Sequence, residues 1–492
     1  MERIGNLING EWQPSKTGRT TRDTNPANLD EVIAEFPLSG EEDVRAAVAA
    51  AKAALPAWRA MPAPRRGEIL LAAWEQLRAR KEELATALTK EEGKTLGESR
   101  GEVQKALNVL EYTAGEGRRF SGQQAPSELP STLVYTVREP LGVVALVTPW
   151  NFPVAIPVWK LAPALLCGNT AILKPASLTP LCAKILAEAF LDAKLPRGVL
   201  GLLYGSGGQV GEALCAHPDV AGISFTGSNE VGAQLYARGA ERHKRLQCEM
   251  GGKNALVVLE DADLDLAAAA IVDGAFGSTG QRCTATSRVV AHREVAASLC
   301  DRLCERAQSL VVGDGMREGT NMGPLVDEKQ LESVLGFIEA GKQEGARLRT
   351  GGSRLGGAVH GRGYFVQPTL FDRVQPGMRI AQEEIFGPVL SVLEVADFEE
   401  AVAVTNGVRY GLSSSIYTRD LTRAFRFCER VETGIVHVNS PTVGGEAQVP
   451  FGGMKATGVG EREMGPQAIE FYSQWKAVYV DYTGARRTTK VY

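Results

Sequence analysis

The chain has few of the residues that build metal sites or disulfide frameworks. It contains only five histidines, and none of its eight cysteines belongs to a Cys-x-x-Cys pair. The only close pair, Cys300 and Cys304, has the i,i+4 spacing of a helix. Structural zinc needs clustered ligands, and disulfide frameworks belong mainly to small secreted domains. We therefore expect no metal, and we interpret every cysteine except Cys283 as a small buried apolar residue. The cysteines occupy positions 167, 182, 215, 248, 283, 300, 304 and 428.

The chain also lacks a long apolar run and an excess of positive charge. No stretch is long and apolar enough to cross a bilayer, and the first residues, Met1-Glu-Arg-Ile-Gly-Asn-Leu, show no apolar signal region. The formal net charge of the 492-residue chain is -4, which argues against nucleic acid as the main partner. These features predict a cytoplasmic globular protein with no membrane partner and room for two to four domains.

Strands and helices are expected to alternate through most of the chain. Hairpins and loops are predicted in residues 7–36, and helices from Ser39 to about Gly122. A first alternating series follows, and a second one runs over residues 254–450. This pattern predicts an α/β fold with doubly wound parallel sheets and ligands at the C-terminal ends of strands. Strands are predicted at 132–138, 143–147, 170–174, 199–203, 221–225, 245–249 and in the tail from 475, and helices in the second series near 263–277, 294–311, 327–344, 397–406 and 420–432.

One stretch combines a carboxylate with a thiol. Glu249-Met-Gly-Gly-Lys-Asn254 is followed by Ser278-Thr-Gly-Gln-Arg-Cys283-Thr-Ala. Gly-Gly pairs and single cysteines are common, so neither half is specific alone. Together they indicate a thiol nucleophile and a carboxylate base that meet in one site.

Two glycine-containing turns follow predicted strands. Gly205-Ser-Gly-Gly-Gln-Val-Gly211 misses the G-x-G-x-x-G spacing by one residue, so a nucleotide-binding turn and a closely packed helix entry are equally open. In Phe225-Thr-Gly-Ser228, the serine either meets a pyrophosphate at a helix N-terminus or simply caps the helix.

Two further strand ends carry a polar side chain. Lys174, in Lys174-Pro-Ala-Ser177, either reaches a ribose or lies harmlessly along apolar surface. Asn151, in Thr148-Pro-Trp-Asn-Phe-Pro153, stands between two prolines that stiffen the backbone. An oxyanion donor must be held this rigidly, although a structural turn asparagine is the alternative.

The order of these motifs resembles the aldehyde dehydrogenase superfamily nearly from end to end. Met250 departs from the leucine of many members, and this change conserves volume. The motifs are Thr-Pro-Trp-Asn151-Phe-Pro, Lys174-Pro-Ala-Ser, Phe-Thr-Gly-Ser228, Glu249-Met-Gly-Gly-Lys, Gly-Gln-Arg-Cys283, Glu383-Glu-Ile-Phe-Gly-Pro388 and Pro450-Phe-Gly-Gly453.

The resemblance implies a role for each matching residue. Cys283 would attack an aldehyde, Asn151 and the Cys283 amide would hold the oxyanion, and Glu249 would activate the water that hydrolyses the thioester. We expect Arg282 or local amides to lower the pKa of the thiol. Glu384 would hold the nicotinamide ribose, Phe386 would flank the ring, and Lys174 would meet the adenosine ribose. The implied coenzyme-binding residues are Thr148, Pro149, Trp150, Lys174, Ser177, Gly207, Phe225, Gly227, Ser228, Met250, Gly251, Glu384 and Phe386, and the implied substrate-binding residues are Arg119, Arg282 and Phe451.

The resemblance also implies an architecture. We expect a Rossmann-like coenzyme domain from residues 1–123 and 141–251, and a second α/β catalytic domain from residues 252–452. A small β oligomerisation arm and the C-terminal tail would comprise residues 124–140 and 453–492. The implied assembly is a homodimer or a homotetramer.

The end of the chain resembles a subgroup that oxidises 2-oxoglutarate semialdehyde (2,5-dioxopentanoate). The stretches are Val438-Asn-Ser-Pro-Thr-Val-Gly-Gly-Glu-Ala and Gln474-Trp-Lys-Ala-Val-Tyr-Val-Asp-Tyr-Thr-Gly484. Non-phosphorylating glyceraldehyde-3-phosphate and succinate-semialdehyde dehydrogenases remain open. A non-redox thioester hydrolase or acyltransferase would not need Glu384, Lys174 or the nucleotide-binding sheet.

Two polar positions bear on substrate charge and coenzyme choice. Arg119 and Arg282 are candidates for binding an anionic aldehyde, although arginines also favour helix C-termini. Ser177 stands where strictly NAD-dependent relatives often carry glutamate, so we expect NADP to be preferred while NAD stays usable. The alternative is that Ser177 caps the helix that opens near Thr179.

Overall fold

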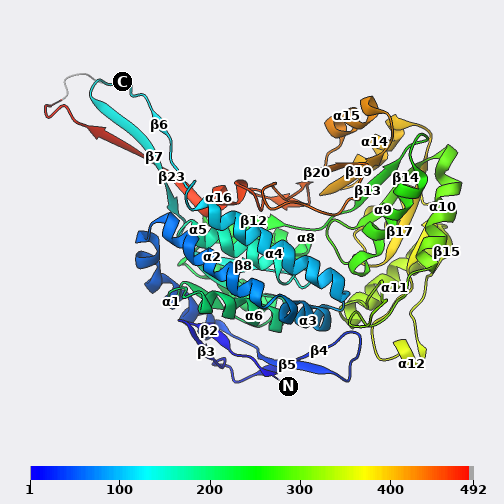
Figure 1. Cartoon of the computed structure of the whole chain (residues 1–492), viewed down its shortest axis with the longest axis horizontal. Helices are drawn as coiled ribbons and strands as arrows, with labels where there is room; N and C mark the ends of the chain where they lie inside the picture. The colour runs from blue at the N-terminus through cyan, green and yellow to red at the C-terminus, as the bar shows by residue number, and fades with distance from the viewer. Residues whose placement is uncertain (1, 487–492) are drawn as a thin grey trace.

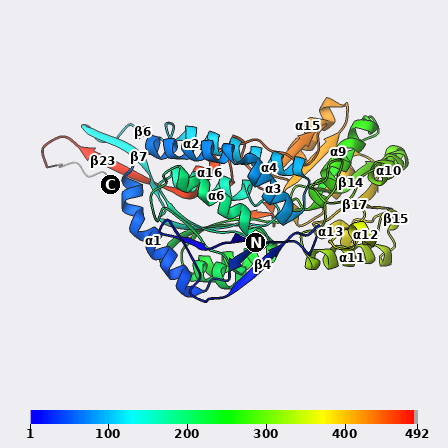
Figure 2. The same cartoon turned by 60° about the horizontal axis from the view of Figure 1, so that its bottom comes forward.

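Two large β-sheets and one projecting arm organise the chain (Figures 1 and 2). This computed structural model describes residues 2–486. Met1 and residues 487–492, the outer ends of the predicted segments 1–123 and 453–492, lie outside the described residues. Within residues 2–486, no helix combines the length and the apolarity needed to cross a membrane.

The first sheet has a parallel centre with antiparallel strands at its edges. The run from β12 to β10 is parallel, whereas β2 and β22 are antiparallel to their neighbours. The strands predicted at 143–147, 170–174 and 245–249 have these bounds in the structure, and the other two differ by one residue at each end. The order is β22 (Gly458–Val459), β12 (Arg245–Glu249), β11 (Val220–Thr226), β8 (Val143–Val147), β9 (Thr170–Lys174), β10 (Leu200–Leu202), β2 (Asn6–Ile8) and β3 (Glu11–Gln13).

Helices cover both faces of this sheet because alternate strand residues are apolar on each side. Val144 and Leu146 of β8 pack into one core, and Val143 and Ala145 pack into the other. Fully burying such a side chain contributes about 1.5–3 kcal/mol, so both faces favour a helical cover. The first core includes α2 (Ala63–Ala79), α3 (Lys81–Glu92), α4 (Leu96–Glu116), α5 (Ala155–Leu166) and α6 (Pro180–Asp192); the second includes α1 (Glu41–Ala60), η1 (Gly207–Gly211), α7 (Glu212–Ala216) and α8 (Asn229–Ala240).

The second sheet repeats the doubly wound plan, so the α/β prediction is confirmed. All of its strands are parallel except β15. Its order is β15 (Arg347–Thr350), β16 (Thr369–Asp372), β17 (Val389–Val395), β14 (Thr286–His292), β13 (Asn254–Val258), β19 (Ser413–Tyr417) and β20 (Ile435–Val438). The helices predicted in this half are present as α9 (Leu264–Phe276), α10 (Arg293–Gln308), α11 (Glu328–Gln343), α14 (Phe398–Asn406) and α15 (Leu421–Arg430).

The arm extends away from both sheets at the upper left of Figure 1. It consists of β6 (Gln124–Ala125), β7 (Thr132–Pro140) and β23 (Ser473–Asp481), with β23 paired antiparallel to the whole of β7. Arg138 of β7 lies 3.9 Å over the ring of Trp475. The β-run and the tail strand predicted from the sequence therefore pair with each other.

The chain between the second sheet and the arm returns to the body of the molecule. There β21 (Met454–Lys455) pairs with β18 (Tyr410–Gly411), β22 joins the first sheet, and α16 (Gln467–Tyr472) packs on α5. Thus, of the described part of segment 453–492, only β23 joins the arm sheet. The remaining elements are β1 (Glu2–Arg3), β4 (Thr20–Thr24), β5 (Val32–Pro37), η2 (Gly277–Gly280), α12 (Gly357–His360) and α13 (Arg379–Gln382).

One short turn joins the two sheets and fixes where a site can form. Strand β12 ends at Glu249, and β13 begins at Asn254. Cys283 lies just before β14, the parallel neighbour of β13. The site therefore lies at the C-terminal ends of the strands in the first sheet, as predicted. The cysteine comes from the other side, at the N-terminal ends of the strands in the second sheet.

Candidate active site

The turn between β12 and β13 brings the cysteine loop against the end of the first sheet. A Cβ at Gly252 would lie 2.7 Å from the carbonyl oxygen of Cys283, and one at Gly251 would collide with the Glu384 carboxylate. The side-chain amide of Asn254 donates to the same Cys283 carbonyl oxygen (2.8 Å). Only glycine lets backbones approach this closely, which explains the Gly-Gly pair in the motif.

The segment before Cys283 holds a strained backbone. Ser278 and Thr279 have φ values of 48° and 58°, in the left-handed region. Such residues cost of order 1–3 kcal/mol each and persist only where their surroundings fix them. Here the Thr279 hydroxyl donates to the carbonyl oxygen of Gly323 (3.1 Å), and the Ser278 amide donates to Glu98 (2.5 Å). These contacts determine where the thiol stands.

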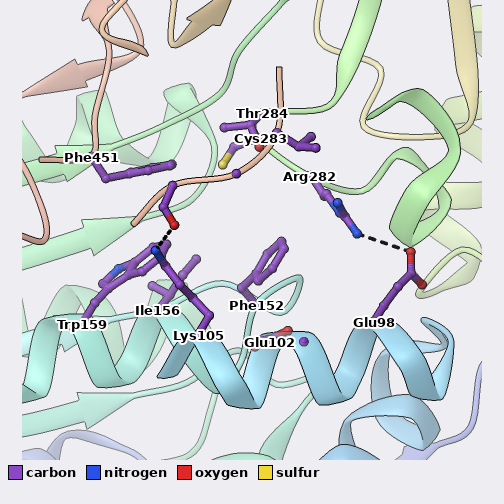
Figure 3. Close-up of a pocket in the computed structure, with 14 residues that line it drawn as sticks. Glu98, Glu102, Lys105, Phe152, Ile156, Trp159, Arg282, Cys283, Thr284 and Phe451 are labelled. Atoms are coloured by element: carbon purple, nitrogen blue, oxygen red, sulfur yellow. Dashed lines mark hydrogen bonds and ion pairs between the residues drawn. The ribbon is translucent and has the colours of Figure 1, made fainter. Parts of the chain in front are cut away.

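Cys283 lies at the junction of two cavities, the first of which is shown in Figure 3. The first encloses about 320 Å³ and the second about 260 Å³. A thiol that borders both can meet a different molecule from each side. The first cavity is lined by Glu98, Gly101, Glu102, Lys105, Phe152, Ile156, Trp159, Arg282, Cys283, Thr284, Val443, Gly444, Gly445 and Phe451. The second is lined by Pro149, Trp150, Asn151, Ile156, Thr226, Gly227, Ser228, Met250, Gly251, Cys283, Gln330, Ser333, Glu384, Ile385 and Phe386.

Asn151 presents its side-chain amide beside the thiol, in the second cavity. Its Nδ2 donates to the carbonyl oxygen of Gln281 (3.0 Å), which leaves one N–H for another acceptor. Gln281 is fixed in turn, because its Oε1 accepts from the Val326 amide (3.0 Å). The arrangement is a rigid hydrogen-bond donor next to a nucleophile, as an oxyanion site requires.

The expectation that the thiol pKa would be lowered is wrong for this structure. Burial and then the negative charges of Glu249 and Glu384 raise the pKa of Cys283 well above its usual value. Arg282 does not offset them, because its guanidinium points to Glu98 (3.3 Å) and to the Ser278 hydroxyl (3.0 Å). The thiol therefore needs higher pH, or a change in local charge, to ionise.

Glu249 occupies a buried position near the thiol. Among the described residues, its Oε1 has no hydrogen-bond partner, and its Oε2 would be 2.9 Å from a Cβ at Gly452. Burial, followed by the charge of Glu463, raises the pKa of Glu249 well above its usual range. Glu463 itself pairs with Lys160. Although Glu249 lines neither cavity, it is the largest ionic influence on the pKa of Cys283.

The second cavity has a carboxylate and two aromatic rings at its wall. Burial raises the pKa of Glu384 to about 7, and one of its oxygens accepts from the Gly252 amide (2.8 Å). The rings of Phe386 and Trp150 meet edge to face with centroids 5.4 Å apart. Phe386 has a φ of 56°, and Gln330 fixes it by donating to its carbonyl oxygen (2.8 Å). A carboxylate beside a flat apolar wall suits a ribose that carries an aromatic ring.

The sequence pattern of the aldehyde dehydrogenase family matches residues 12–478. The chain belongs to this family. The resemblance stated from the motifs is therefore confirmed, and NAD(P) is the coenzyme class that its members use.

Individual relatives cover almost the whole chain. The chain is 44% identical to the alpha-ketoglutaric semialdehyde dehydrogenase of Bacillus subtilis, over 96% of this chain and 97% of that protein. It is 47% identical to the alpha-ketoglutarate semialdehyde dehydrogenase of Haloferax volcanii, over 97% and 99%. Among solved structures, an NADP dependent enzyme of E. coli superimposes with a TM-score of 0.94 at 37% identity, covering 98% of both chains. A betaine aldehyde dehydrogenase of Staphylococcus aureus in complex with NAD+ gives 0.96 at 32%, covering 99% and 97%.

The structure brings eight of the predicted coenzyme residues together in the second cavity of this family member. They are Pro149, Trp150, Gly227, Ser228, Met250, Gly251, Glu384 and Phe386. Ser228 also accepts from the Val231 amide (3.5 Å), so it caps α8 as well. Sequence reasoning missed Gln330, whose side chain holds the Phe386 loop, because nothing in its local pattern marks it.

The other predicted coenzyme residues lie elsewhere along the first sheet, outside the cavity lining. Thr148 follows the last residue of β8, and Lys174 is the last residue of the neighbouring strand β9. Burial lowers the pKa of Lys174 to about 8. Ser177 donates to the Gly205 carbonyl oxygen (3.1 Å) rather than capping α6. The α6 amides of Leu181 and Cys182 instead donate to Glu91. Gly207 opens η1, and Phe225 lies buried in β11.

The predicted substrate residues divide between the first cavity and the surface. Arg282 and Phe451 line the cavity, with the Phe451 ring packed on Trp159 at 5.3 Å. Arg119 does not reach it: its side chain is 62% exposed and pairs with Glu116 (2.7 Å).

Lys105 is the cation that sequence reasoning missed. It lines the first cavity with Glu98 and Glu102, at the i, i+4 and i+7 positions of one face of α4. This spacing was visible in the sequence, but only the fold shows that the face points to Cys283.

We expect Gly251→Ala to weaken coenzyme binding. The added methyl group must displace the Glu384 carboxylate. Losing a charge-assisted hydrogen bond costs about 1.5–3 kcal/mol, so the dissociation constant should rise roughly ten- to a hundredfold. Gly377→Ala is the matched control, because Gly377 is exposed outside both cavities and a Cβ there has no atom within 4 Å. Fluorescence titration of both variants measures the effect, and unchanged affinity in Gly251→Ala would contradict it.

Proposed function

We propose that this enzyme oxidises 2-oxoglutarate semialdehyde to 2-oxoglutarate, with NADP as the preferred coenzyme and NAD as a usable one. The observation that carries the substrate assignment is Lys105, a cation on the wall of the first cavity beside Cys283. Within residues 2–486, no carboxylate lies at ion-pair distance from its ammonium, which donates to the Gly445 carbonyl oxygen. The relatives named for this semialdehyde support the same assignment.

The two cations of the cavity differ in availability. Arg282 is already paired with Glu98, which is itself held at the start of α4 by the Thr95 amide (3.0 Å). Among residues 2–486, the Lys105 ammonium donates only to the Gly445 carbonyl oxygen, so its charge remains open to a substrate carboxylate. The aromatic wall of Phe152, Trp159 and Phe451 would then hold the short carbon chain between Lys105 and the thiol.

The proposed chemistry begins at the thiol. The Cys283 thiolate adds to the aldehyde carbon, and the resulting oxyanion accepts hydrogen bonds from the free N–H of Asn151 and from the Cys283 amide. Bound NAD(P) supplies the acceptor for the hydride that leaves the thiohemiacetal carbon. A thioester remains on Cys283. Glu249 then takes a proton from water as the water oxygen attacks the thioester carbon. The C–S bond breaks, the carboxylic acid leaves, and the Cys283 thiolate takes up the proton from Glu249, which regenerates the thiol.

The proposed coenzyme residues divide by the part of the molecule they would hold. Glu384 would bind the nicotinamide ribose, and Phe386 would flank the ring. Lys174 and Ser177, at the end of β9, would meet the adenosine ribose and its 2′-phosphate. The absence of a carboxylate at Ser177 supports NADP, and the likenesses to an NADP dependent enzyme and to an enzyme in complex with NAD+ support the use of both coenzymes.

The proposal includes a cytoplasmic homodimer or homotetramer. Its support is the arm, where Leu133 of β7 and Tyr479 and Val480 of β23 are exposed, at 38%, 70% and 41%. Apolar side chains on a strand that projects from the body suit a surface covered by another subunit.

We predict distinct defects for the three catalytic residues. Cys283→Ala should abolish turnover while coenzyme binding persists, because only the nucleophile is lost. Asn151→Ala should lower the rate of thioester formation roughly 10²–10³-fold, the usual loss for one oxyanion donor. Glu249→Gln should still form the thioester but hydrolyse it slowly, which leaves a burst of reduced coenzyme followed by a slow phase. Stopped-flow absorbance separates these phases, and normal turnover in Cys283→Ala would end the proposal.

The same residues fix the sign of the pH dependence. Cys283 and Glu249 must both lose a proton to react, and the pKa of each is raised. The burst rate and the steady-state rate should therefore increase as pH rises from about 6 to 9. In Glu249→Gln the burst rate should still increase with pH, but from a lower pH, because the variant lacks the carboxylate that raises the pKa of Cys283. The slow phase should lose the part of the increase that Glu249 contributes.

We predict that Lys105→Met raises KM selectively for aldehydes that carry a distant carboxylate. One charge-assisted hydrogen bond is worth about 1.5–3 kcal/mol, so KM should rise roughly ten- to a hundredfold. Burial lowers the pKa of Lys105 to about 8, so the wild-type KM should also rise as pH passes this value and the ammonium loses its proton. Arg119→Ala is the matched control, since that arginine lies outside the cavity. An equal rise in KM for hexanal would contradict the role.

We predict that Ser177→Glu suppresses the use of NADP. Two unit charges about 4 Å apart repel by about 4 kcal/mol at an effective dielectric near 20, which is nearly three decades in affinity. The measurement is kcat/KM for both coenzymes in the wild type and the variant. A tenfold preference of the wild type for NAD, or unchanged NADP use in the variant, would refute the coenzyme proposal.

A further inference from the structure

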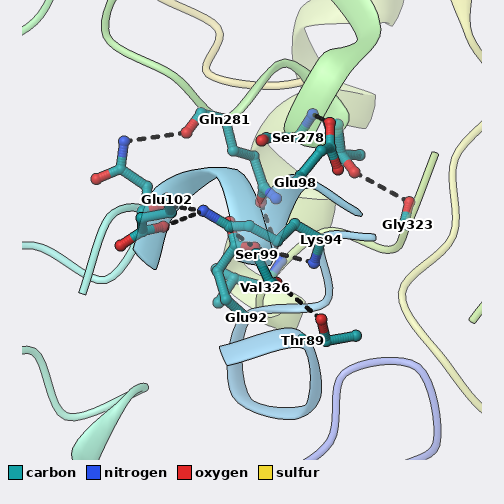
Figure 4. A network of polar contacts seen from close by, with 12 residues as sticks. Thr89, Glu92, Lys94, Glu98, Ser99, Glu102, Ser278, Gln281, Gly323 and Val326 are labelled. Carbon is teal, nitrogen blue, oxygen red and sulfur yellow. Dashed lines mark hydrogen bonds and ion pairs between the residues drawn. The ribbon is translucent and has the colours of Figure 1, made fainter. Parts of the chain in front are cut away.

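A fully buried ion pair of Lys94 and Glu102, shown in Figure 4, contacts the main chain of Asn151. Lys94 follows α3, and its side chain is 1% exposed, as is that of Glu102 on α4. The ammonium donates to Glu102 Oε2 (2.8 Å) and to the main-chain carbonyl oxygen of Asn151 (2.6 Å). The lysine thus contacts the backbone of the residue whose side chain faces the thiol.

The other oxygen of Glu102 holds the far end of the same turn. Its Oε1 accepts from the amides of Val154 (2.8 Å) and Ala155 (3.1 Å), where α5 begins. These amides have no partner within the helix, and the positive end of the helix dipole favours a carboxylate. One ion pair therefore binds a carbonyl at residue 151 and two amides at residues 154 and 155.

Lys94 keeps its charge in this position. Burial alone would lower its pKa, but the charges of Glu102 and then Glu92 outweigh burial and raise it. Burial raises the pKa of Glu92 itself to about 8, so Glu102 is the main counter-ion at neutral pH. The ammonium also lies 4.3 Å from the centre of the ring of Phe152, which lines the first cavity. The ion pair therefore contacts the turn whose Phe152 lines the first cavity and whose Asn151 lines the second.

We propose that the Lys94–Glu102 pair is a positioning device that sets the backbone of residues 151–155, and through it the side-chain amide of Asn151. This inference rests on the proposed role of Asn151 as oxyanion donor. A buried ion pair is weak grounds for added stability, because desolvation offsets much of the attraction. The pair acts here on geometry, because the side chains of Lys94 and Glu102 both form hydrogen bonds with the backbone of one turn. A displacement of about 1 Å at a catalytic group can cost roughly 10²-fold in rate.

The test is a double-mutant cycle on the rate of thioester formation. Lys94→Met should lower the burst rate of reduced coenzyme roughly ten- to a hundredfold, with the coenzyme dissociation constant unchanged. In the Asn151→Ala background the same substitution should cost less than about twofold, because its effect passes through Asn151. Lys90→Met is the matched control: this lysine on α3 pairs with Glu31 at the surface, and its loss should leave the burst rate unchanged.

A second variant covers a failure to fold. Lys94→Met leaves Glu102 buried without its counter-ion, so the thermal unfolding of the variant is measured as well. If Lys94→Met does not fold, the double variant Lys94→Met with Glu102→Gln, which removes both charges, takes its place in the cycle. If Lys94→Met lowers the burst rate by the same factor in the Asn151→Ala background as in the wild type, the positioning role alone is overturned. The same holds if weaker coenzyme binding accounts for the slower burst. A full burst rate in Asn151→Ala would overturn both this role and the proposed oxyanion donor.

Discussion

The close approach of two backbones, the turn after β12 and the loop that carries Cys283, is the constraint on which the site depends. No side chain fits at Gly252, and Asn254 then ties the loop to the start of β13 through the Cys283 carbonyl. The same turn leaves room for Glu384 beside Gly251. The Cys283 thiol from one sheet and the Glu249 carboxylate at a strand end of the other can therefore lie close together, because two of the four residues in the turn that joins the sheets are glycines. Larger residues there would separate the two halves of the chemistry while leaving each sheet intact.

The buried ionisable groups around this turn differ in whether an oppositely charged partner compensates their desolvation. Lys94 with Glu102 and Lys160 with Glu463 are buried pairs, and each partner compensates the desolvation of the other. Glu249, Cys283 and Lys253 are less well compensated: one Glu249 oxygen and the Lys253 ammonium have no partner among the described residues, and burial shifts the pKa of all three groups toward the neutral form. Uncompensated groups near an open cavity are candidates for a change of protonation during a reaction. Of the three, Cys283 borders both cavities.

The sequence predicted much of this arrangement, because the strands are short, apolar and bounded by turn residues. The bounds of β8, β9 and β12 are those expected, and their C-terminal ends carry the motifs that mark the site. What the sequence could not predict are contacts between helices and loops that are distant along the chain. Lys105 stands on α4 and Arg119 follows its C-terminal end, and only packing shows that Arg119 pairs at the surface while Lys105 lines the cavity that contains the thiol. Similarly, Arg282 directly precedes Cys283 in sequence, yet its guanidinium pairs with Glu98 and does not offset the burial that raises the thiol pKa.

The charge pattern of the first cavity also bears on how a product would leave. With Arg282 held by Glu98, Lys105 offers one open positive charge, which matches the single carboxylate of the proposed semialdehyde. Oxidation would create a second carboxylate at the thioester carbon, and Arg282, the other cation among the described residues that line this cavity, is already paired with Glu98. A charge that leaves water without gaining a partner carries a desolvation cost. The cavity therefore matches the single charge of the proposed substrate better than the two charges of its product, and this difference would favour release.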